Sequence, residues 1–181
     1  RSPRQAYFLE GHREFSPHND QELAGYAQFA ALLRHNNIQW DTLALKGTNE
    51  VPAACQLLVI AGGRDRFLTS ELERIDAYLR QGGRLLVLMH SMAPTGLDTL
   101  LARWGVEVGE DLLFDPDNTI NKFDLITSNF FNHAITRPLF QAELHIANPP
   151  RSIASSSLGR QNVDTPKVEP LVATGEQGVA V

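Results

Sequence analysis

Three short segments carry polar residues suited to acid–base or nucleophilic chemistry, and each follows a run of apolar residues. They are Glu10 to His12, Gly62 to Arg64, and His90 with Ser91. If the apolar runs are strands of one parallel sheet in the order 2-1-3-4, all three segments lie on one rim, outside the carboxyl ends of the strands. A histidine there could activate Ser91 while Glu10 orients the base, as in a hydrolase.

The motifs around these residues do not identify a catalytic site. Ser91 lacks the G-x-S-x-G pattern that exposes a hydrolase nucleophile. The Gly62-Gly63 pair does not extend to a nucleotide-binding motif, although Arg64 beside it could meet a carboxylate or phosphate. We therefore predict a ligand-binding rim without catalytic residues, and the alternative is that these side chains only cap strands and face water. The predicted rim consists of Glu10, Gly11, His12, Gly62, Gly63, Arg64, His90 and Ser91.

The sequence gives little support for a metal site, a cofactor site or a reactive thiol. The six histidines show no H-E-x-x-H motif or short paired spacing, so we predict neither a metal site nor a cofactor. His12 and His18 share one predicted loop and form the best candidate pair. The single cysteine, Cys55, precedes an apolar run, which favours a small buried residue over a strand-end nucleophile.

Composition is that of one globular domain. The chain has 181 residues, of which 43% are hydrophobic and 20% charged. A formal net charge of −5 argues against nucleic-acid binding, which needs clustered Lys and Arg. No apolar run approaches the roughly 18 residues that cross a bilayer. Because the sequence starts without Met and stops on an apolar tail, we expect it to be part of a longer protein.

Strand and helix patterns alternate through the first two thirds of the chain. This alternation predicts right-handed βαβ crossovers and a mainly parallel α/β sheet flanked by helices. Strands are expected at 6–9, at 38–45 near one edge, and at 57–61 and 84–90 with the aliphatic composition of central strands.

Residues typical of helix ends bracket three predicted helices. The first is capped by Asn19 or Asp20, packs Leu23, Tyr26, Ala27, Ala30 and Leu33 inward, and ends at Asn36-Asn37. The second is capped by Thr69 or Ser70, with Glu73 completing a capping box in the latter case, and stops at Gly82. The third runs from Leu97 to Trp104 and closes at Gly105.

The last third has a different character, with turn residues at 115–118 and strand-like pieces at 124–127 and 144–147. Few large apolar residues occur there, so this part would make a marginal core alone. We predict one α/β domain over residues 1–181, with a βαβ core at 1–108 and a β-rich extension of the same sheet at 109–181.

A set of short sequence segments, in a fixed order, spans nearly the whole chain. It comprises Tyr7 to His12, Leu57 to Gly62, Leu68 to Leu79, Gly82 to Leu88, Trp104 to Val108, His133 to Leu139 and Glu169 to Thr174. In order and spacing, the set resembles the extracytoplasmic auxiliary domain of gliding-motility-type ABC transporter systems, the GldG-like or ABC-transporter-auxiliary family.

The resemblance implies a flavodoxin-like, class I glutamine amidotransferase-like fold in a protein that is membrane-anchored at full length and accompanies an ABC permease and ATPase. It also implies a domain that is not an enzyme. The amidotransferase reaction itself is removed because this chain has His90-Ser91-Met92 where true amidotransferases place a cysteine on a nucleophile elbow. Ala134 departs from the proline expected in the family.

Two functional hypotheses follow. The first is a non-catalytic, extracytoplasmic (periplasmic-side) domain that binds a partner subunit, peptide or glycan. The second is a hydrolase or carbohydrate-active protein with its site at the predicted rim, since the same fold pattern occurs in trehalose-utilisation-like proteins and fold does not decide function.

Overall fold

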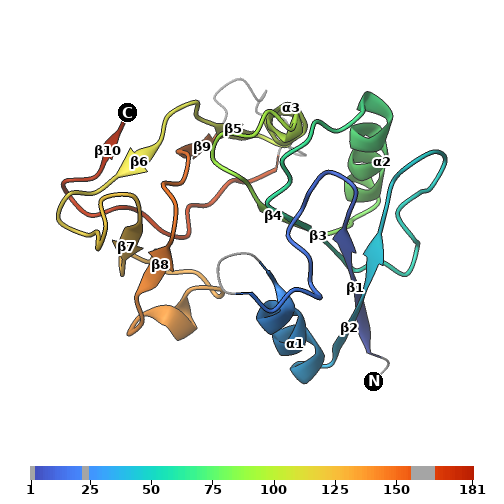
Figure 1. The fold of residues 1–181 in the computed structure, drawn as a ribbon, viewed down its shortest axis with the longest axis horizontal. Coiled ribbons are helices and arrows are strands. Elements are labelled where there is room, and N and C mark those ends of the chain that lie inside the picture. Colours follow the sequence, from blue (N-terminus) through green and yellow to red (C-terminus); the bar gives the residue numbers. More distant parts are fainter. Residues whose placement is uncertain (1–2, 22–24, 156–165) are drawn as a thin grey trace. The chain divides into compact units, whose positions relative to one another are not determined.

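The computed structural model describes residues 3–21, 25–155 and 166–181 (Figure 1). The chain forms two compact units, Arg1–Leu97 and Asp98–Val181.

The first unit is built on a four-stranded parallel sheet. Its strands are β1 (Arg4–Leu9), β2 (Ile38–Leu43), β3 (Leu57–Ala61) and β4 (Leu85–Leu88), in the order β2-β1-β3-β4. The predicted α/β class, a mainly parallel sheet flanked by helices, and the predicted strand order are confirmed.

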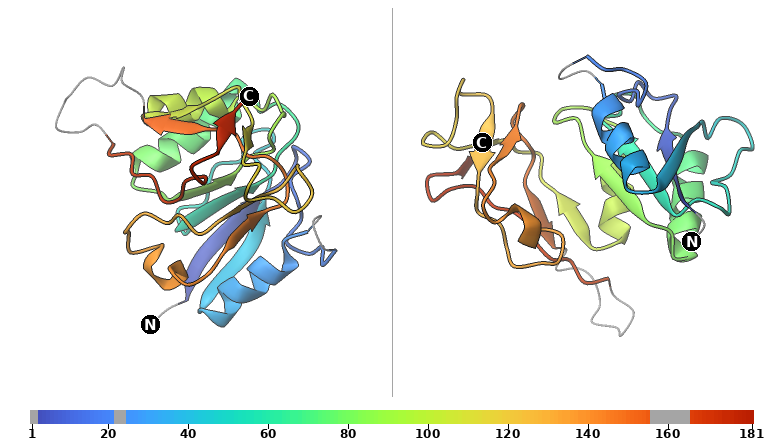
Figure 2. Two further views of the ribbon diagram at one scale, coloured as in Figure 1. Left: turned by 90° about the vertical axis from the view of Figure 1, so that its left-hand side faces the viewer. Right: turned by 90° about the horizontal axis from the view of Figure 1, so that it is seen from below.

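Two helices cover opposite faces of this sheet (Figure 2). Helix α1 (Ala27–His35) packs Ala30 and Leu33 against Phe8 of β1 and Val59 of β3. Leu58 and Ile60 of β3 alternate with Val59 and therefore point to the other face, where α2 (Thr69–Arg80) lies. Because β3 is covered on both faces, Leu58, Val59 and Ile60 are completely buried.

The edge strands differ in how well their sequences predict their places. β2 lies at one edge, as expected, although it ends at Leu43. β4 forms the other edge of the four-stranded sheet, so the prediction of a central strand at 84–90 is wrong. Leu85, Leu86 and Val87 are only half-buried and Leu88 is exposed, which its purely aliphatic sequence does not reveal.

Helix starts were predicted less well than helix ends. α1 begins at Ala27 and not after Asn19 or Asp20, because the Asn19 side chain accepts the Gln21 N–H in a local turn. Leu23, expected on its inner face, lies outside the described residues. The predicted ends are confirmed, with Asn37 and Gly82 at φ +58° and +87°.

Helix α2 has Leu68 as its N-cap, in place of Thr69 or Ser70. The carboxylate of Glu71, and not that of Glu73, accepts the Leu68 N–H at 2.8 Å. Helix α3 (Leu97–Arg103) is followed by Gly105 at φ +80°, as predicted.

The second unit contains short antiparallel strand pairs. β5 (Val106–Val108) pairs with β9 (Ile153–Ser155), β6 (Leu113–Phe114) with β10 (Val179–Ala180), and β7 (Leu125–Thr127) with β8 (Leu144–Ile146). A 3-10 helix, η1, spans Arg137–Leu139.

The positions of β7 and β8 confirm the strands predicted at 124–127 and 144–147. These pairs form ladders of their own and do not join the four-stranded sheet, so the expected extension of the same sheet is wrong. The division at Leu97–Asp98 also falls before the predicted change of character at residue 108, and the single domain stays a prediction. No helix within the described ranges has the length and apolar character needed to span a bilayer.

Candidate functional site

The loop after β1 folds over the carboxyl end of β3 and brings the first two rim segments together. The Phe15 N–H donates to the Ala61 carbonyl at 2.8 Å. The His12 carbonyl accepts the N–H groups of Arg64 and Asp65 at 2.8 and 3.0 Å. These backbone bonds fix His12 beside the Gly62-Gly63 turn.

Gly62 is required at this turn for two reasons. Its φ of +68° lies in the left-handed region, which side chains disfavour. A Cβ at this position would also lie only 2.5 Å from the ring of Phe15. What approaches Gly62 is therefore the protein's own Phe15, and ligand contact at the Gly62-Gly63 pair stays a prediction.

His12 lies at the centre of this loop and is 6% exposed. Its Nε2 is 2.9 Å from Glu71 Oε2, and its Nδ1 is 3.4 Å from Glu14 Oε1. The ring stacks on Phe67 with a centroid distance of 3.9 Å. Glu71 Oε2 also accepts the Leu68 N–H, so one carboxylate both caps α2 and holds the imidazole.

A second, exposed ion pair closes the same loop. Arg13, at φ +58°, donates from Nε to Asp65 Oδ1 at 2.8 Å. This hydrogen bond holds the pKa of Asp65 below its ordinary value. The loop is thus tied to the end of β3 and to the segment that follows it at His12, Arg13 and Phe15.

The remaining rim residues lie at the strand ends without forming a catalytic set. Glu10, Gly11 and Arg64 are exposed, and the Arg64 guanidinium lies 5.3 Å from the centre of the Phe15 ring. His90 Nδ1 accepts the Met92 N–H at 3.4 Å. Within the described part of the chain, no hydrogen bond joins Ser91 to His90 or Glu10. Ligand binding at the rim stays a prediction.

Sequence reasoning found His12 but missed the residues that hold it. Glu14 and Phe67 gave no recognisable signal, since a glutamate in a loop and a phenylalanine before a helix are common. Glu71 was detectable in principle, because a glutamate at the third helical position commonly bonds back to the N-cap. The predicted helix start was one or two residues late, so Glu73 and not Glu71 was expected at the capping-box position.

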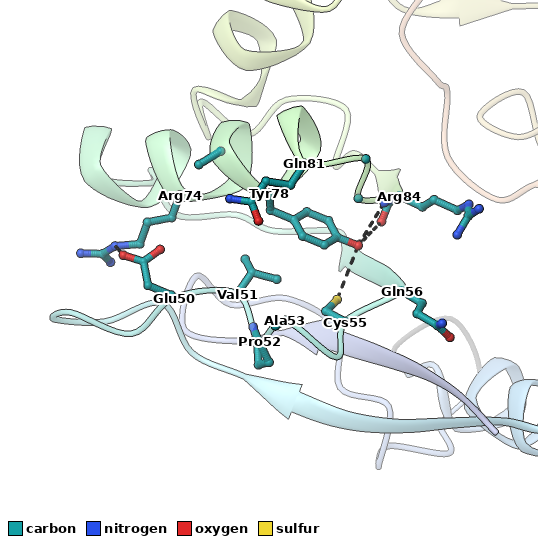
Figure 3. A pocket seen from close by; sticks show the side chains of 13 residues that line it. Glu50, Val51, Pro52, Ala53, Cys55, Gln56, Arg74, Tyr78, Gln81 and Arg84 are labelled. Atoms are coloured by element: carbon teal, nitrogen blue, oxygen red, sulfur yellow. Dashed lines mark hydrogen bonds and ion pairs between the residues drawn. The ribbon is translucent and has the colours of Figure 1, made fainter. Parts of the chain in front are cut away.

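A pocket of about 500 Å³ lies at the opposite, amino ends of β3 and β4 (Figure 3). Tyr78 Oη accepts hydrogen bonds from Cys55 Sγ at 3.5 Å and the Arg84 N–H at 3.0 Å, and donates to the Arg84 carbonyl at 3.0 Å. The residues that line the pocket include Glu50, Val51, Pro52, Ala53, Cys55, Gln56, Arg74, Tyr78, Gln81 and Arg84.

The polar groups of this pocket are largely used by the protein itself. Burial raises the pKa of the Cys55 thiol and raises that of Tyr78 to about 12, so both stay protonated at neutral pH. Arg74 donates to the carbonyls of Leu45 and Gly47 at 2.7 and 2.5 Å. In Figure 3 the Arg84 guanidinium points away from Tyr78. Cys55 is the buried residue that the sequence predicted.

The best histidine pair predicted from the sequence does not form a metal site. His18 packs its ring against Trp40, with centroids 5.0 Å apart, and not toward His12. Across the residues that the structure describes, no group of three His, Cys, Asp or Glu side chains has the geometry to hold a metal ion.

Comparison with known families decides the relationship of this chain. The model of the ABC-transport auxiliary family, described as an ABC-type uncharacterized transport system, matches residues 4–180. The chain belongs to this family. The match covers nearly the whole sequence and confirms the resemblance drawn from the ordered segments. ABC-transport auxiliary proteins are transport-associated, and that is the functional class of this chain.

Members of a eukaryotic transport system are also similar to this ABC-transport auxiliary chain. Intraflagellar transport protein 52 homolog of Mus musculus is 32% identical over 93 residues, covering 48% of this chain and 21% of that protein. Its Homo sapiens counterpart is 29% identical over 124 residues, covering 62% of this chain and 27% of that protein. The chain thus spans only about a quarter of the length of these curated relatives.

A solved structure titled mmIFT52 N-terminal domain has the same fold. It superposes with a TM-score of 0.64 at 20% sequence identity and covers 85% of this chain and 69% of that chain. At this identity the likeness concerns the fold alone. It supports the mixed α/β architecture of the ABC-transport auxiliary chain.

Proposed function

We propose that this chain is a non-catalytic extracytoplasmic domain of an ABC-transporter-associated protein, where it binds or scaffolds a partner subunit. The observation that carries the proposal is the family match over residues 4–180. A family defined by an ABC-type transport system makes the permease and ATPase of such a system the expected partners.

The geometry at the rim supports a role without chemistry. A nucleophile needs a base within hydrogen-bond reach and a third group that orients the base. Ser91 makes no hydrogen bond with His90, and His12 is buried between two carboxylates and a phenyl ring. The histidine with the most elaborate surroundings therefore holds the fold together.

The named relatives support a role in a larger assembly. Both are called intraflagellar transport proteins, and this domain accounts for about a quarter of their length. We infer that the present domain is likewise one part of a larger transport-associated protein. In that protein we place it on the periplasmic side, attached to the membrane through segments outside this sequence, as in systems of the gliding-motility type.

Co-purification of the full-length protein tests this function. A tagged copy, expressed at native level and extracted in mild detergent, is expected to recover the ABC permease and ATPase subunits of its host. The double variant His90→Ala with Ser91→Ala is the matched control and should recover them equally. Added protease should digest the domain in spheroplasts, which would check its extracytoplasmic place.

Two results would contradict the proposal. One is the recovery of no ABC subunit by the wild-type protein. The other is turnover of an ester, amide or glycoside substrate by the purified protein that disappears in the His90→Ala, Ser91→Ala variant, which would favour the hydrolase hypothesis.

A further inference from the structure

A turn in the second unit, residues 119–124, is organised around one buried carboxylate. The Asp124 side chain is completely buried, and its Oδ1 accepts the Thr119 hydroxyl at 2.5 Å and the N–H groups of Ile120 and Asn121 at 2.9 and 3.1 Å. The other oxygen, Oδ2, is 2.6 Å from His145 Nε2 on β8. Asp124 thus links the turn to the β7–β8 ladder.

The rest of the turn is equally well bonded. Asn121 Oδ1 accepts the N–H groups of Phe123 and Asp124 at 2.9 and 3.0 Å, and Thr119 Oγ1 accepts the Lys122 N–H at 2.9 Å. Every backbone N–H from 120 to 124 therefore donates to a side-chain oxygen within the turn. Lys122 has a φ of +72°, a costly conformation for a residue with a Cβ, which these bonds hold in place.

This rigid turn presents apolar side chains to the outside. Ile120 is 74% exposed and Phe123 is 67% exposed, with the exposed Lys122 between them. Both lie outside the buried apolar core of this unit, which among its described residues consists of Leu100 and Leu125. Because the hydrogen-bonded turn already orders the backbone that carries this apolar pair, binding would cost little additional backbone entropy, which is a property of an interface anchor.

The charges in this unit favour a protein over a lipid surface as the occupant. Residues 98–181 carry six Lys or Arg and eleven Asp or Glu, a net charge of −5. Attraction to anionic lipid needs several clustered cations, and the turn has one. A protein pocket with an apolar lining and an acidic rim would complement Ile120, Phe123 and Lys122 together.

We propose that the 119–124 turn is the anchor through which this domain docks on a subunit of its ABC transport complex. Ile120 and Phe123 enter an apolar pocket on that subunit, and Lys122 meets a carboxylate at its edge. This inference rests on the proposed function and adds to it the surface and the chemistry of recognition.

The test compares the affinity of full-length protein for the purified permease–ATPase complex in detergent. Ile120→Ser with Phe123→Ser should weaken binding by at least about 30-fold, as loss of two anchor residues does. Lys122→Glu should weaken it by about five- to tenfold, and more at low salt than at high salt. All three side chains are exposed, so an unchanged Tm shows that the fold is intact.

The matched control is Leu32→Ser with Leu68→Ser, which removes two leucines that are 56% and 64% exposed in the first unit. It should bind within about twofold of wild type. Equal binding by wild type and the Ile120→Ser, Phe123→Ser variant would overturn the docking site while leaving the proposed function standing. Wild-type protein that fails to bind the complex would overturn both.

Vesicle flotation distinguishes a lipid bilayer from a protein as the binding partner of the 119–124 turn. The 181-residue domain, expressed apart from the proposed membrane-attachment segments, should not float with vesicles of phosphatidylcholine and phosphatidylglycerol. Flotation that disappears in the Ile120→Ser, Phe123→Ser variant would identify lipid as the occupant and overturn the proposal. Equal weakening of complex binding by the control variant would overturn it as well, since loss of any exposed apolar pair would then have the same effect.

Discussion

At the scale of single residues, Glu71 has the most concentrated structural role. Its Oε2 accepts the Leu68 N–H at the start of α2 and faces His12 Nε2 from the loop after β1. The side chain is almost completely buried. Loss of this carboxylate would leave a buried imidazole and an orphaned helix N–H together, and each uncompensated polar group is costly.

Glu71→Ala should therefore lower the free energy of unfolding by about 2 to 4 kcal/mol. Glu71→Gln retains an oxygen that can accept both bonds, so it should cost less than about 1.5 kcal/mol. Urea denaturation of the two variants measures the difference. Similar stability of Glu71→Ala and wild type would show that the buried contacts of His12 contribute nothing.

The site illustrates what a sequence can and cannot reveal about single residues. His12 was detectable because a histidine directly after an apolar strand is placed at the rim by the parallel topology alone. Its partners Glu14 and Glu71 lie 2 and 59 residues away. The long-range pairing depends on the exact start of α2, which capping residues predicted one or two positions late.

Asp124 gives the second unit a dependence on pH. The Thr119 hydroxyl, the N–H groups of Asn121 and Ile120, and His145 hold the pKa of this carboxyl well below its ordinary value. A carboxyl whose pKa is lowered by folding stabilises the protein above its unfolded pKa of about 3.9, and this contribution is lost as pH falls toward the folded pKa.

We therefore expect the wild-type protein to lose stability steadily below about pH 4. Asp124→Asn should be less stable than wild type at pH 7 and should show a smaller further loss on acidification. Urea midpoints at pH 7, 4 and 3 measure how steeply the stability of each of the two proteins falls with pH. Parallel slopes for the two proteins would contradict the role of Asp124.

At the scale of elements, the turn after β3 combines a left-handed backbone conformation at Gly62 with close packing of the Phe15 ring against the same residue. Gly62 and Gly47 share a φ of +68°, but only Gly62 has a side chain, that of Phe15, against it. Comparing alanine substitutions at the two glycines therefore separates the cost of backbone strain from the cost of steric crowding.

Gly47→Ala should cost about 1 kcal/mol, the usual penalty of a Cβ in the left-handed region. Gly62→Ala should cost at least about 2 to 3 kcal/mol, because the new methyl group must also displace Phe15. Thermal and urea unfolding of both variants test this, and equal losses would show that Phe15 moves aside freely.

Elements of the first unit could be predicted because their patterns differ in period. Five aliphatic residues before Gly62-Gly63 specify β3, and its burial on both faces follows from the same run. The pattern of β4 is just as apolar, so composition could not show that it lies at the edge of the four-stranded sheet. Pairing of two- and three-residue strands in the second unit depends on distant partners, which no local pattern encodes.

At the scale of the whole molecule, each of the two units is stabilised internally by a different kind of interaction. The first has an apolar core that includes Phe8, Leu58 and Ile60. Among the described residues of the second, only Leu100 and Leu125 are fully buried apolar side chains, whereas Asp115 and Asp124 are buried acids that accept several hydrogen bonds.

Hydrogen exchange should reveal this difference. The amides of β3 should be protected by burial at both pH 7 and pH 3, whereas the Ile126 amide, bonded to the Asn118 carbonyl next to Asp115 and Asp124, should lose at least about tenfold in protection at pH 3 after correction for intrinsic rates. Equal loss of protection in both units would contradict a separate, carboxylate-dependent stabilisation of the second.

The loop that carries His12 and Phe15 has a consequence for the search for ligands. In sheets of this kind, the space outside the strand ends commonly receives a small molecule. Here the Phe15 amide is bonded to Ala61, the Phe15 ring covers Gly62, and the His12 ring rests on Phe67. The protein supplies its own tethered occupant for this position, and a free compound would have to compete with a segment whose effective concentration is very high.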